Sequence, residues 1–383
     1  MEIAEKIHEV SRPVGSAGNR YYRPELDCLR FFAFFAVFVY HCPGGDAAYF
    51  SARHIPLPAL AASVTSAGRF GVDLFFLLSA YLITELLLRE QERFGRLDLR
   101  SFYVRRILRI WPLYFLGLLI GVLLALVDHR QYFPAKYAVA FVLMSGNWLP
   151  FFGVYVDSVM GLLWTVSVEE QFYLLWPAFM SKSRQGRTLL YASGGLFFVA
   201  MVSRLLLAGH ARALFSEAPL AINTLARLDP FALGIATAVL MHKADLALGW
   251  AARLRFLIIG CAIWVIAGHF RFNGLSTGFL VFGYPAMAVG AWFIFRAALG
   301  SSIAPRWLRY LGKISYGLYL FHEFALYCAL KFVGGVHTLR VFIVYWPLGL
   351  SLTVLMAALS YRFFESPFLA LKERFAHVQS RPI

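Results

Sequence analysis

An arginine and a histidine stand at the two ends of the first long apolar stretch of the chain, LDCLRFFAFFAVFVYHCPGG, residues 26–45. Arg30 and His41 are eleven residues apart, which on an α-helix is three turns plus about 20° and a rise of roughly 16 Å. Their side chains are therefore predicted to share one face. An arginine can hold an anion, and an imidazole can take a proton from a hydroxyl group. The pair predicts a path along which an anionic group binds near Arg30 while chemistry occurs at His41.

Each member of this pair also has a simpler explanation. Arg30 alone would be interpreted as a basic residue whose long side chain reaches the membrane surface. His41 alone is equally well explained as an interfacial residue that ends a helix. Their position on one face is what favours a functional site.

A second basic pair occurs in FYVRRILRIWPLYF, residues 102–115. Arg106 and Arg109 are three positions apart and face the same way on a helix. Guanidinium groups in this arrangement can hold phosphate groups. An anchor to anionic lipids of the inner leaflet explains the spacing equally well.

Two adjacent carboxylates, Glu169 and Glu170, lie within the apolar stretch LLWTVSVEEQFYLLWP, residues 162–177. Carboxylates at membrane depth are costly and are usually functional or paired with a cation on another helix. Adjacent helical residues point about 100° apart. At most one of the two is therefore expected to line a cavity.

Three further ionisable residues of the apolar stretches are considered for the site: Asp73, His322 and Glu323. A structural ion pair is the favoured interpretation for Asp73 and Glu323, and His322 is assigned to the supporting wall of a cavity. The four cysteines match no metal-ligand spacing, and no metal site is predicted. Cys42 beside His41 is disfavoured as a nucleophile because adjacent helical side chains diverge.

The elements that position these residues follow from composition. The chain has 383 residues, of which 60% are hydrophobic, 17% aromatic and only 15% charged, so it is predicted to be a membrane protein. Apolar windows long enough to cross a bilayer recur along the chain, which predicts an all-α polytopic bundle of about ten transmembrane helices. The expected spans lie near residues 29–43, 70–88, 110–127, 162–180, 188–208, 219–241, 256–270, 277–295, 311–333 and 341–362.

The doubtful stretch is 137–153, which is apolar but is interrupted by small and polar residues and by a proline. If it does not cross, and if the N-terminus is cytoplasmic, 25 lysines and arginines fall on the cytoplasmic side and 7 on the other, as the positive-inside rule requires. We therefore expect a re-entrant or interfacial segment there, with both termini cytoplasmic. The expected organisation is a cytoplasmic segment at 1–28, a transmembrane domain at 29–364 and a cytoplasmic tail at 365–383.

This distribution also explains the net charge of +15 without a nucleic-acid partner, because the basic residues sort by membrane side. The expected location is a bacterial cytoplasmic (inner) membrane, with membrane lipids as partners.

The motifs together resemble the membrane acyltransferase-3 family. The resemblance rests on YRPELDCLRFFAFFAVFVYHCPGG, GVDLFFLLSAYLIT, FYVRRILRIWPLYF, LLWTVSVEEQFYLLWP and ISYGLYLFHE, in this order and over nearly the whole chain. It implies a fold of about ten helices that moves acyl groups, usually acetyl, from a cytoplasmic donor such as acetyl-CoA to surface carbohydrates. These include surface polysaccharides, exopolysaccharide and lipopolysaccharide.

The resemblance also implies roles for individual residues. His41 matches the catalytic histidine, Arg30 its partner on the first span, and Arg106 and Arg109 the pair that engages the donor. Asp73, Glu169, Glu170 and His322 are expected to support the cavity. This chain departs from the usual family pattern at two places. Ser79-Ala80-Tyr81 stands where Ser-Gly-Phe is common, and this change is expected to tighten helix packing there. Thr165 stands where serine is commoner.

The sequence thus predicts an integral-membrane O-acyltransferase that uses acyl-CoA as a substrate, has no bound cofactor and acts on a surface or exported glycan. His41 would be a general base or would itself carry the acyl group, and either route requires a neutral imidazole. A longer acyl donor such as succinyl-CoA stays open. The alternatives are a transporter or flippase of a polysaccharide or its lipid-linked precursor, which would use the same buried charges as a pathway, and a structural subunit of an export assembly.

Overall fold

The computed structural model describes residues 21–42, 47–52, 54–128, 135–156, 158–183, 185–214, 216–244, 246–271, 276–334 and 339–375. Within these ranges all regular structure is helical, which confirms the all-α prediction. Most of the expected N-terminal segment 1–28 and the end of the expected tail 365–383 lie outside the described residues.

Six helices are long and apolar enough to cross a membrane by length and composition. They are Pro58–Phe94, Leu99–Val127, Gly186–Ala213, Trp250–Phe270, Phe279–Ala298 and Ile343–Glu373. Three further helices of 18 or 19 residues are α2 (Pro24–His41), α8 (Trp164–Lys182) and α15 (Ser315–Val333). These three carry His41, Glu169, Glu170 and His322, and such polar side chains lower their hydropathy. The expected count of about ten spans stays a prediction.

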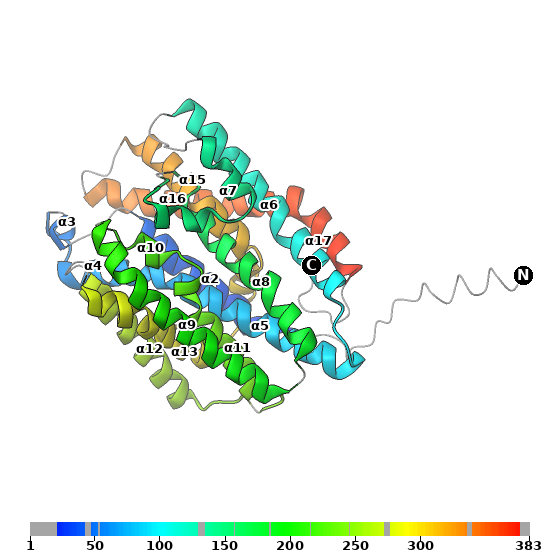
Figure 1. Cartoon of the computed structure of the whole chain (residues 1–383). Coiled ribbons are helices and arrows are strands. Elements are labelled where there is room, and N and C mark those ends of the chain that lie inside the picture. The colour runs from blue at the N-terminus through cyan, green and yellow to red at the C-terminus, as the bar shows by residue number, and fades with distance from the viewer. Residues whose placement is uncertain are drawn as a thin grey trace, which may run out of the picture.

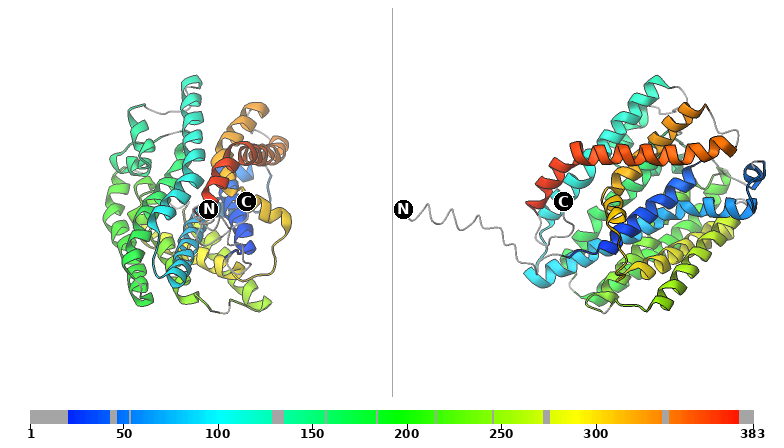
Figure 2. Two further views of the ribbon diagram at one scale, coloured as in Figure 1. Left: turned by 90° about the vertical axis from the view of Figure 1, so that its right-hand side faces the viewer. Right: turned by 180° about the vertical axis from the view of Figure 1, so that it is seen from behind.

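The bundle is arranged around α2 and α5 (Gly71–Phe94), which run through its interior (Figures 1 and 2). The remaining long elements are α6 (Leu99–Val127), α9 (Gly186–Ala213), α12 (Trp250–Arg271), α13 (Tyr284–Ala298) and α16 (Leu339–Ser360). In Figure 1, α9, α11 (Asp229–Met241), α12 and α13 lie on one side of this pair, and α6, α15 and α16 lie on the other.

Two glycines set the close approach of α2 to the start of α5. A Cβ atom built on Gly68 would lie 2.2 Å from the carbonyl oxygen of Ala36, and one on Gly71 would lie 2.3 Å from that of Ala33. Only glycine leaves room for backbones this close. The helix that carries His41 is thereby fixed against the helix that carries Asp73.

The expected span 219–241 is not one helix. It contains the short α10 (Ala218–Ala221), a break, and α11 (Asp229–Met241), whose 13 residues rise only about 20 Å. Pro230 stands in the first turn of α11, where proline is tolerated. The fully buried Arg204 donates to the carbonyl oxygen of Ala226 at 2.6 Å and pairs with Asp229 at 3.1 Å. The prediction of one continuous helix was therefore wrong. Apolar content does not reveal the break, because the polar groups at the break are satisfied by an arginine on another helix.

The doubtful stretch 137–153 forms α7 (Ala138–Val142) and a 3-10 helix, η4 (Gly146–Phe152), neither long enough to span. Gln171 of α8 donates to the carbonyl oxygen of Met144 and to Oδ1 of Asn147, both at 3.0 Å. Asn147 in turn donates to Thr224 at 2.8 Å. These hydrogen bonds satisfy non-helical backbone that apolar surroundings would otherwise penalise.

The C-terminal part of the bundle is more segmented than expected. The span predicted at 311–333 divides at Ile314 into α14 (Arg306–Lys313) and α15. After α16, a π-helical turn (Tyr361–Glu365) leads into α17 (Ser366–Glu373), which packs against α6 (Figure 1). Part of the expected tail is therefore an ordered helix.

Candidate active site

His41 ends α2, and its imidazole contacts two neighbouring residues of α15. Nδ1 of His41 lies 3.0 Å from the carbonyl oxygen of Val37 and 3.1 Å from Nε2 of His322. On the opposite side of the ring, Nε2 of His41 lies 3.3 Å from Oε1 of Glu323. His322 is completely buried, whereas His41 and Glu323 are each 28% exposed.

These contacts determine which nitrogen atoms carry protons. A carbonyl oxygen only accepts hydrogen bonds, so Nδ1 of His41 donates to Val37 and Nδ1 of His322 donates to Tyr319. With one proton on each neutral ring, Nε2 of His322 has a lone pair, and the single N–H at Nδ1 of His41 is shared between this nitrogen and the carbonyl oxygen of Val37. The basic nitrogen of His41 is then Nε2, which faces Glu323 and gains an ion-pair partner when it takes up a proton.

Among the described residues, the spacing of these same three side chains suits a metal ion. His41, His322 and Glu323 each offer a ligand atom, and these atoms lie within 4.8 Å of one another. The hydrogen bonds of the two imidazoles and the contact with Glu323 account for the cluster without an ion.

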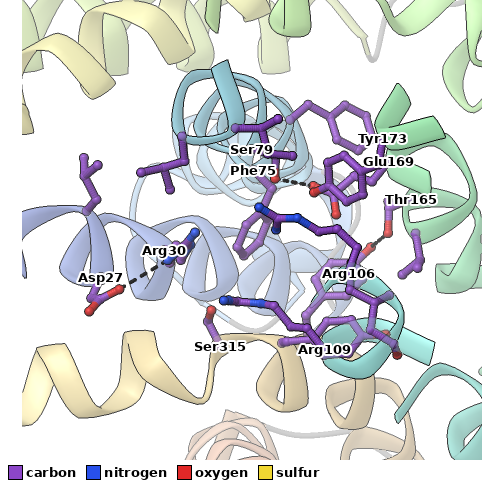
Figure 3. A pocket seen from close by; sticks show the side chains of 18 of the residues that line it. Asp27, Arg30, Phe75, Ser79, Arg106, Arg109, Thr165, Glu169, Tyr173 and Ser315 are labelled. Carbon is purple, nitrogen blue, oxygen red and sulfur yellow. Dashed lines mark hydrogen bonds and ion pairs between the residues drawn. The ribbon is translucent and has the colours of Figure 1, made fainter. Parts of the chain in front are cut away.

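A cavity beside α2 is lined by four arginines, and we call it the arginine cavity. They are Arg23, Arg30, Arg106 and Arg109. Figure 3 shows the guanidinium groups of Arg30, Arg106 and Arg109 converging in this space. Arg30 pairs with Asp27 at 3.3 Å, but within the described part of the chain neither Arg106 nor Arg109 has a carboxylate oxygen within 4.0 Å. The cavity therefore carries positive charge that an anionic ligand would neutralise.

Aromatic rings hold Arg106 in place. Its guanidinium carbon lies 5.4 Å from the ring centre of Phe102 and 5.3 Å from that of Tyr173. Such cation–π contacts orient a guanidinium without neutralising its charge. The planar group is thus presented to the cavity with its donors available.

The two adjacent glutamates of α8 face different surroundings, as their positions on a helix predict. Glu169 lines the arginine cavity and accepts a hydrogen bond of 2.7 Å from Ser79 (Figure 3). Glu170 lines neither this cavity nor the one described next, and accepts from Nε1 of Trp111 at 3.0 Å. Glu169 is the member of the pair placed to act in the site.

A second cavity of about 710 Å³ opens at His41, and we call it the histidine cavity. Glu323 lines it, together with one buried and one partly buried ion pair. Arg227 pairs with Asp73 at 2.9 Å, and Arg69 pairs with Glu217 at 2.6 Å. Asp73 therefore has the ion pair expected for it, and its partner, Arg227, lies 154 positions away.

The arginine cavity and the histidine cavity share two wall residues, Val72 and Tyr319. The hydroxyl of Thr165 donates to that of Tyr319 at 3.0 Å. Thr165, one of the two departures from the family pattern, therefore fixes a side chain at the boundary. A ligand in the arginine cavity and a ligand in the histidine cavity would approach each other at this boundary.

The other departure also has a structural explanation. The Tyr81 hydroxyl lies 3.1 Å from that of Tyr21, which lines the arginine cavity just before α2. Burial raises the pKa of the Tyr21 phenol, so this hydroxyl stays protonated and can form a hydrogen bond with that of Tyr81. Ala80 packs tightly on α11, since a Cβ atom on Gly234 would lie 2.8 Å from its Cβ.

The sequence profile described as "Acyltransferase domain" matches residues 23–362. The chain belongs to the acyltransferase-3 family. The O-acetyltransferase OatA of Staphylococcus aureus strain NCTC 8325 / PS 47 is 29% identical over 376 residues, which cover 90% of this chain and 57% of that protein. The putative O-acetyltransferase SAS0844 of strain MSSA476 is 28% identical over 374 residues, 91% of this chain and 57% of that protein. This chain thus spans little more than half the length of these relatives. No solved structure matches it.

In this family member, all eight residues singled out from the sequence lie within the matched range. Six of them line a cavity: Arg30, Arg106, Arg109, Glu169, Asp73 and His41. His322 supports His41 from behind, and Glu170 lies apart. From the sequence, Glu323 was interpreted as a structural residue. Its position next to His322 was a signal that both side chains could reach the same site.

Proposed function

We propose that this protein is an integral-membrane O-acyltransferase that moves an acetyl group from acyl-CoA to a hydroxyl of a surface or exported glycan. The observation that carries the proposal is the pair of cavities that meet at Val72 and Tyr319. One cavity has two arginines, Arg106 and Arg109, that have no carboxylate partner among the described residues and suit a phosphorylated donor, and the other contains a basic imidazole nitrogen. The names of the relatives, O-acetyltransferases, support acetyl as the group transferred.

The donor would enter from the arginine cavity. Arg106 and Arg109, with Arg30, would hold the phosphates of CoA, and the extended pantetheine arm would carry the thioester toward the boundary with the histidine cavity. The acceptor would occupy the histidine cavity, whose charged and hydroxyl-bearing walls suit the hydroxyl groups of a sugar.

In the direct route, Nε2 of His41 removes the proton of the acceptor hydroxyl. The hydroxyl oxygen forms a bond with the thioester carbonyl carbon, and the carbon–sulfur bond then breaks. The thiolate of CoA leaves and takes up the proton from the imidazolium. His322 keeps Nδ1 of His41 oriented, and Glu323 stabilises the transient imidazolium.

In the second route, Nε2 of His41 attacks the thioester carbon itself. CoA thiolate leaves, and an acetyl-imidazole forms at Nε2. The acceptor hydroxyl then attacks this acetyl group and releases the imidazole. Both routes use the same nitrogen, and the tautomer derived above leaves it available for either.

The proposed topology has about ten spans, with both termini cytoplasmic and residues 137–153 as a re-entrant or interfacial segment. The transmembrane acyltransferase domain would extend over residues 29–364, with residues 1–28 and 365–383 on the cytoplasmic side of a bacterial inner membrane. This orientation places the arginine cavity toward the donor pool. It follows from the excess of lysine and arginine in alternate loops.

Transfer of label from radiolabelled acetyl-CoA into cell-surface glycan tests the proposal. Membranes containing the native protein are compared with membranes containing His41→Ala or Arg106→Ala at matched abundance. We expect incorporation of label into the glycan to depend on both His41 and Arg106. A folded His41→Ala protein with full transfer would contradict both routes, and movement of glycan without consumption of donor would favour a transporter.

A further inference from the structure

A smaller cavity continues from the arginine cavity toward the C-terminal helix, and we call it the α17 cavity. The two share Ile83, Leu86, Arg106 and Arg109 as wall residues. The α17 cavity adds four charged groups that the arginine cavity lacks. These are Glu90, Arg105, Lys372 and Glu373.

The helix that contributes Lys372 is held firmly against the start of α6 (Figures 1 and 2). Arg105 donates to the carbonyl oxygen of Phe375 at 2.5 Å, and its guanidinium lies 3.6 Å from Glu90. Arg105 therefore ties α17 to both α5 and α6. This helix lies beyond residue 362, where the family match ends.

Lys372 is an unusual residue in this position. It is only 9% exposed, and the charges of Arg106 and Arg109 repel its ammonium group. Its partner is the neighbouring Glu373, at 3.1 Å, whose side chain is 27% exposed at the rim. Burying a cation among other cations costs free energy. A multiply charged anion that reached all three would remove that cost.

CoA carries negative charge in two places, on its diphosphate and on the 3′-phosphate of its ribose. Arg106 and Arg109 face both cavities and so stand where the diphosphate would pass between them. We propose that the α17 cavity binds the 3′-phosphoadenosine end of the donor, with Lys372 as the residue that recognises the 3′-phosphate. This inference rests on the proposed function, because it assigns the far end of the same donor.

Donor kinetics with acetyl-CoA and with acetyl-3′-dephospho-CoA test this assignment in the full-length protein. For the native protein, loss of the 3′-phosphate is expected to raise the donor KM on the order of tenfold, the size of one charge-assisted contact. Lys372→Gln is expected to raise the KM for acetyl-CoA by a similar factor and to leave that for the dephospho donor unchanged. Lys182→Gln, an exposed residue at the end of α8 that lines none of these cavities, is the matched control.

The outcomes separate this inference from the proposed function. Transfer from both donors with equal KM in the native protein would overturn the role of the α17 cavity and leave the enzyme assignment standing. Equal loss with both donors in Lys372→Gln would show a structural role only. Absence of transfer from either donor to glycan would contradict the proposed function and this inference with it.

A second measurement does not depend on the folding of a variant. Adenosine 3′,5′-bisphosphate is expected to inhibit the native protein on the order of tenfold more strongly than AMP, because only the former carries the 3′-phosphate. Equal inhibition by the two nucleotides would overturn the assignment.

Discussion

Nδ1 of His41 lies 3.1 Å from Nε2 of the completely buried His322. The contact joins the end of α2 to the middle of α15, and the carbonyl oxygens of Val37 and Tyr319 fix its direction. It leaves Nε2 as the nitrogen of His41 that would act in the proposed transfer.

His322 is predicted to be a positioning residue. His322→Leu removes one of the two acceptors of Nδ1 of His41 and leaves only the carbonyl oxygen of Val37. It is expected to lower kcat about tenfold, the effect of about 1.4 kcal/mol, with little change in donor KM. His322→Gln retains a carbonyl acceptor and should recover part of the loss. Steady-state kinetics of both variants measure this difference, and equal defects in the two would argue against the orienting hydrogen bond.

Glu323 is predicted to stabilise the imidazolium of His41. Glu323→Gln removes the negative charge 3.3 Å from Nε2 and is expected to lower kcat by roughly tenfold or more. Steady-state kinetics of the variant measure this effect. A kcat equal to that of the native protein would contradict this role.

Arg106 is predicted to bind donor phosphate through a planar fork held by two rings. Arg106→Gln is expected to raise donor KM roughly tenfold, and Arg106→Lys should restore it only in part because an ammonium cannot form two parallel hydrogen bonds. Isothermal titration with CoA checks the same effect without turnover. Arg255→Gln, an exposed arginine on α12, serves as the control and should bind CoA normally.

Gly68 is predicted to set the approach of α2 to α5. Gly68→Ala places a Cβ atom 2.2 Å from the carbonyl oxygen of Ala36, so the backbones must separate, at an expected loss of about 1–3 kcal/mol in the free energy of unfolding. Thermal unfolding in detergent should show a lower midpoint. Gly194→Ala on α9, where the new Cβ would meet nothing within 4 Å, should be neutral or slightly stabilising. Equal midpoints for the two variants would contradict the prediction.

Much of the local chemistry could be predicted from the sequence because helical spacing fixes which side chains share a face. This holds for Arg106 and Arg109, which point into one cavity, and for Glu169 and Glu170, which do not share one. Hydropathy likewise predicted an all-helical membrane protein. Apolar content did not reveal the break before α11, because the polar groups that satisfy it come from Arg204 on another helix.

The helical class, the positions of the basic residues and His41 as the candidate base could be predicted from the residues alone. The contacts of His322 and Glu323 with His41 are visible only in the folded chain, since His41 and His322 are 281 positions apart. The same packing joined the arginine cavity to the histidine cavity and brought Lys372 beside Arg106 and Arg109. Periodicity records the direction of a side chain on its own helix, whereas which helices become neighbours depends on packing between surfaces that are distant in the chain.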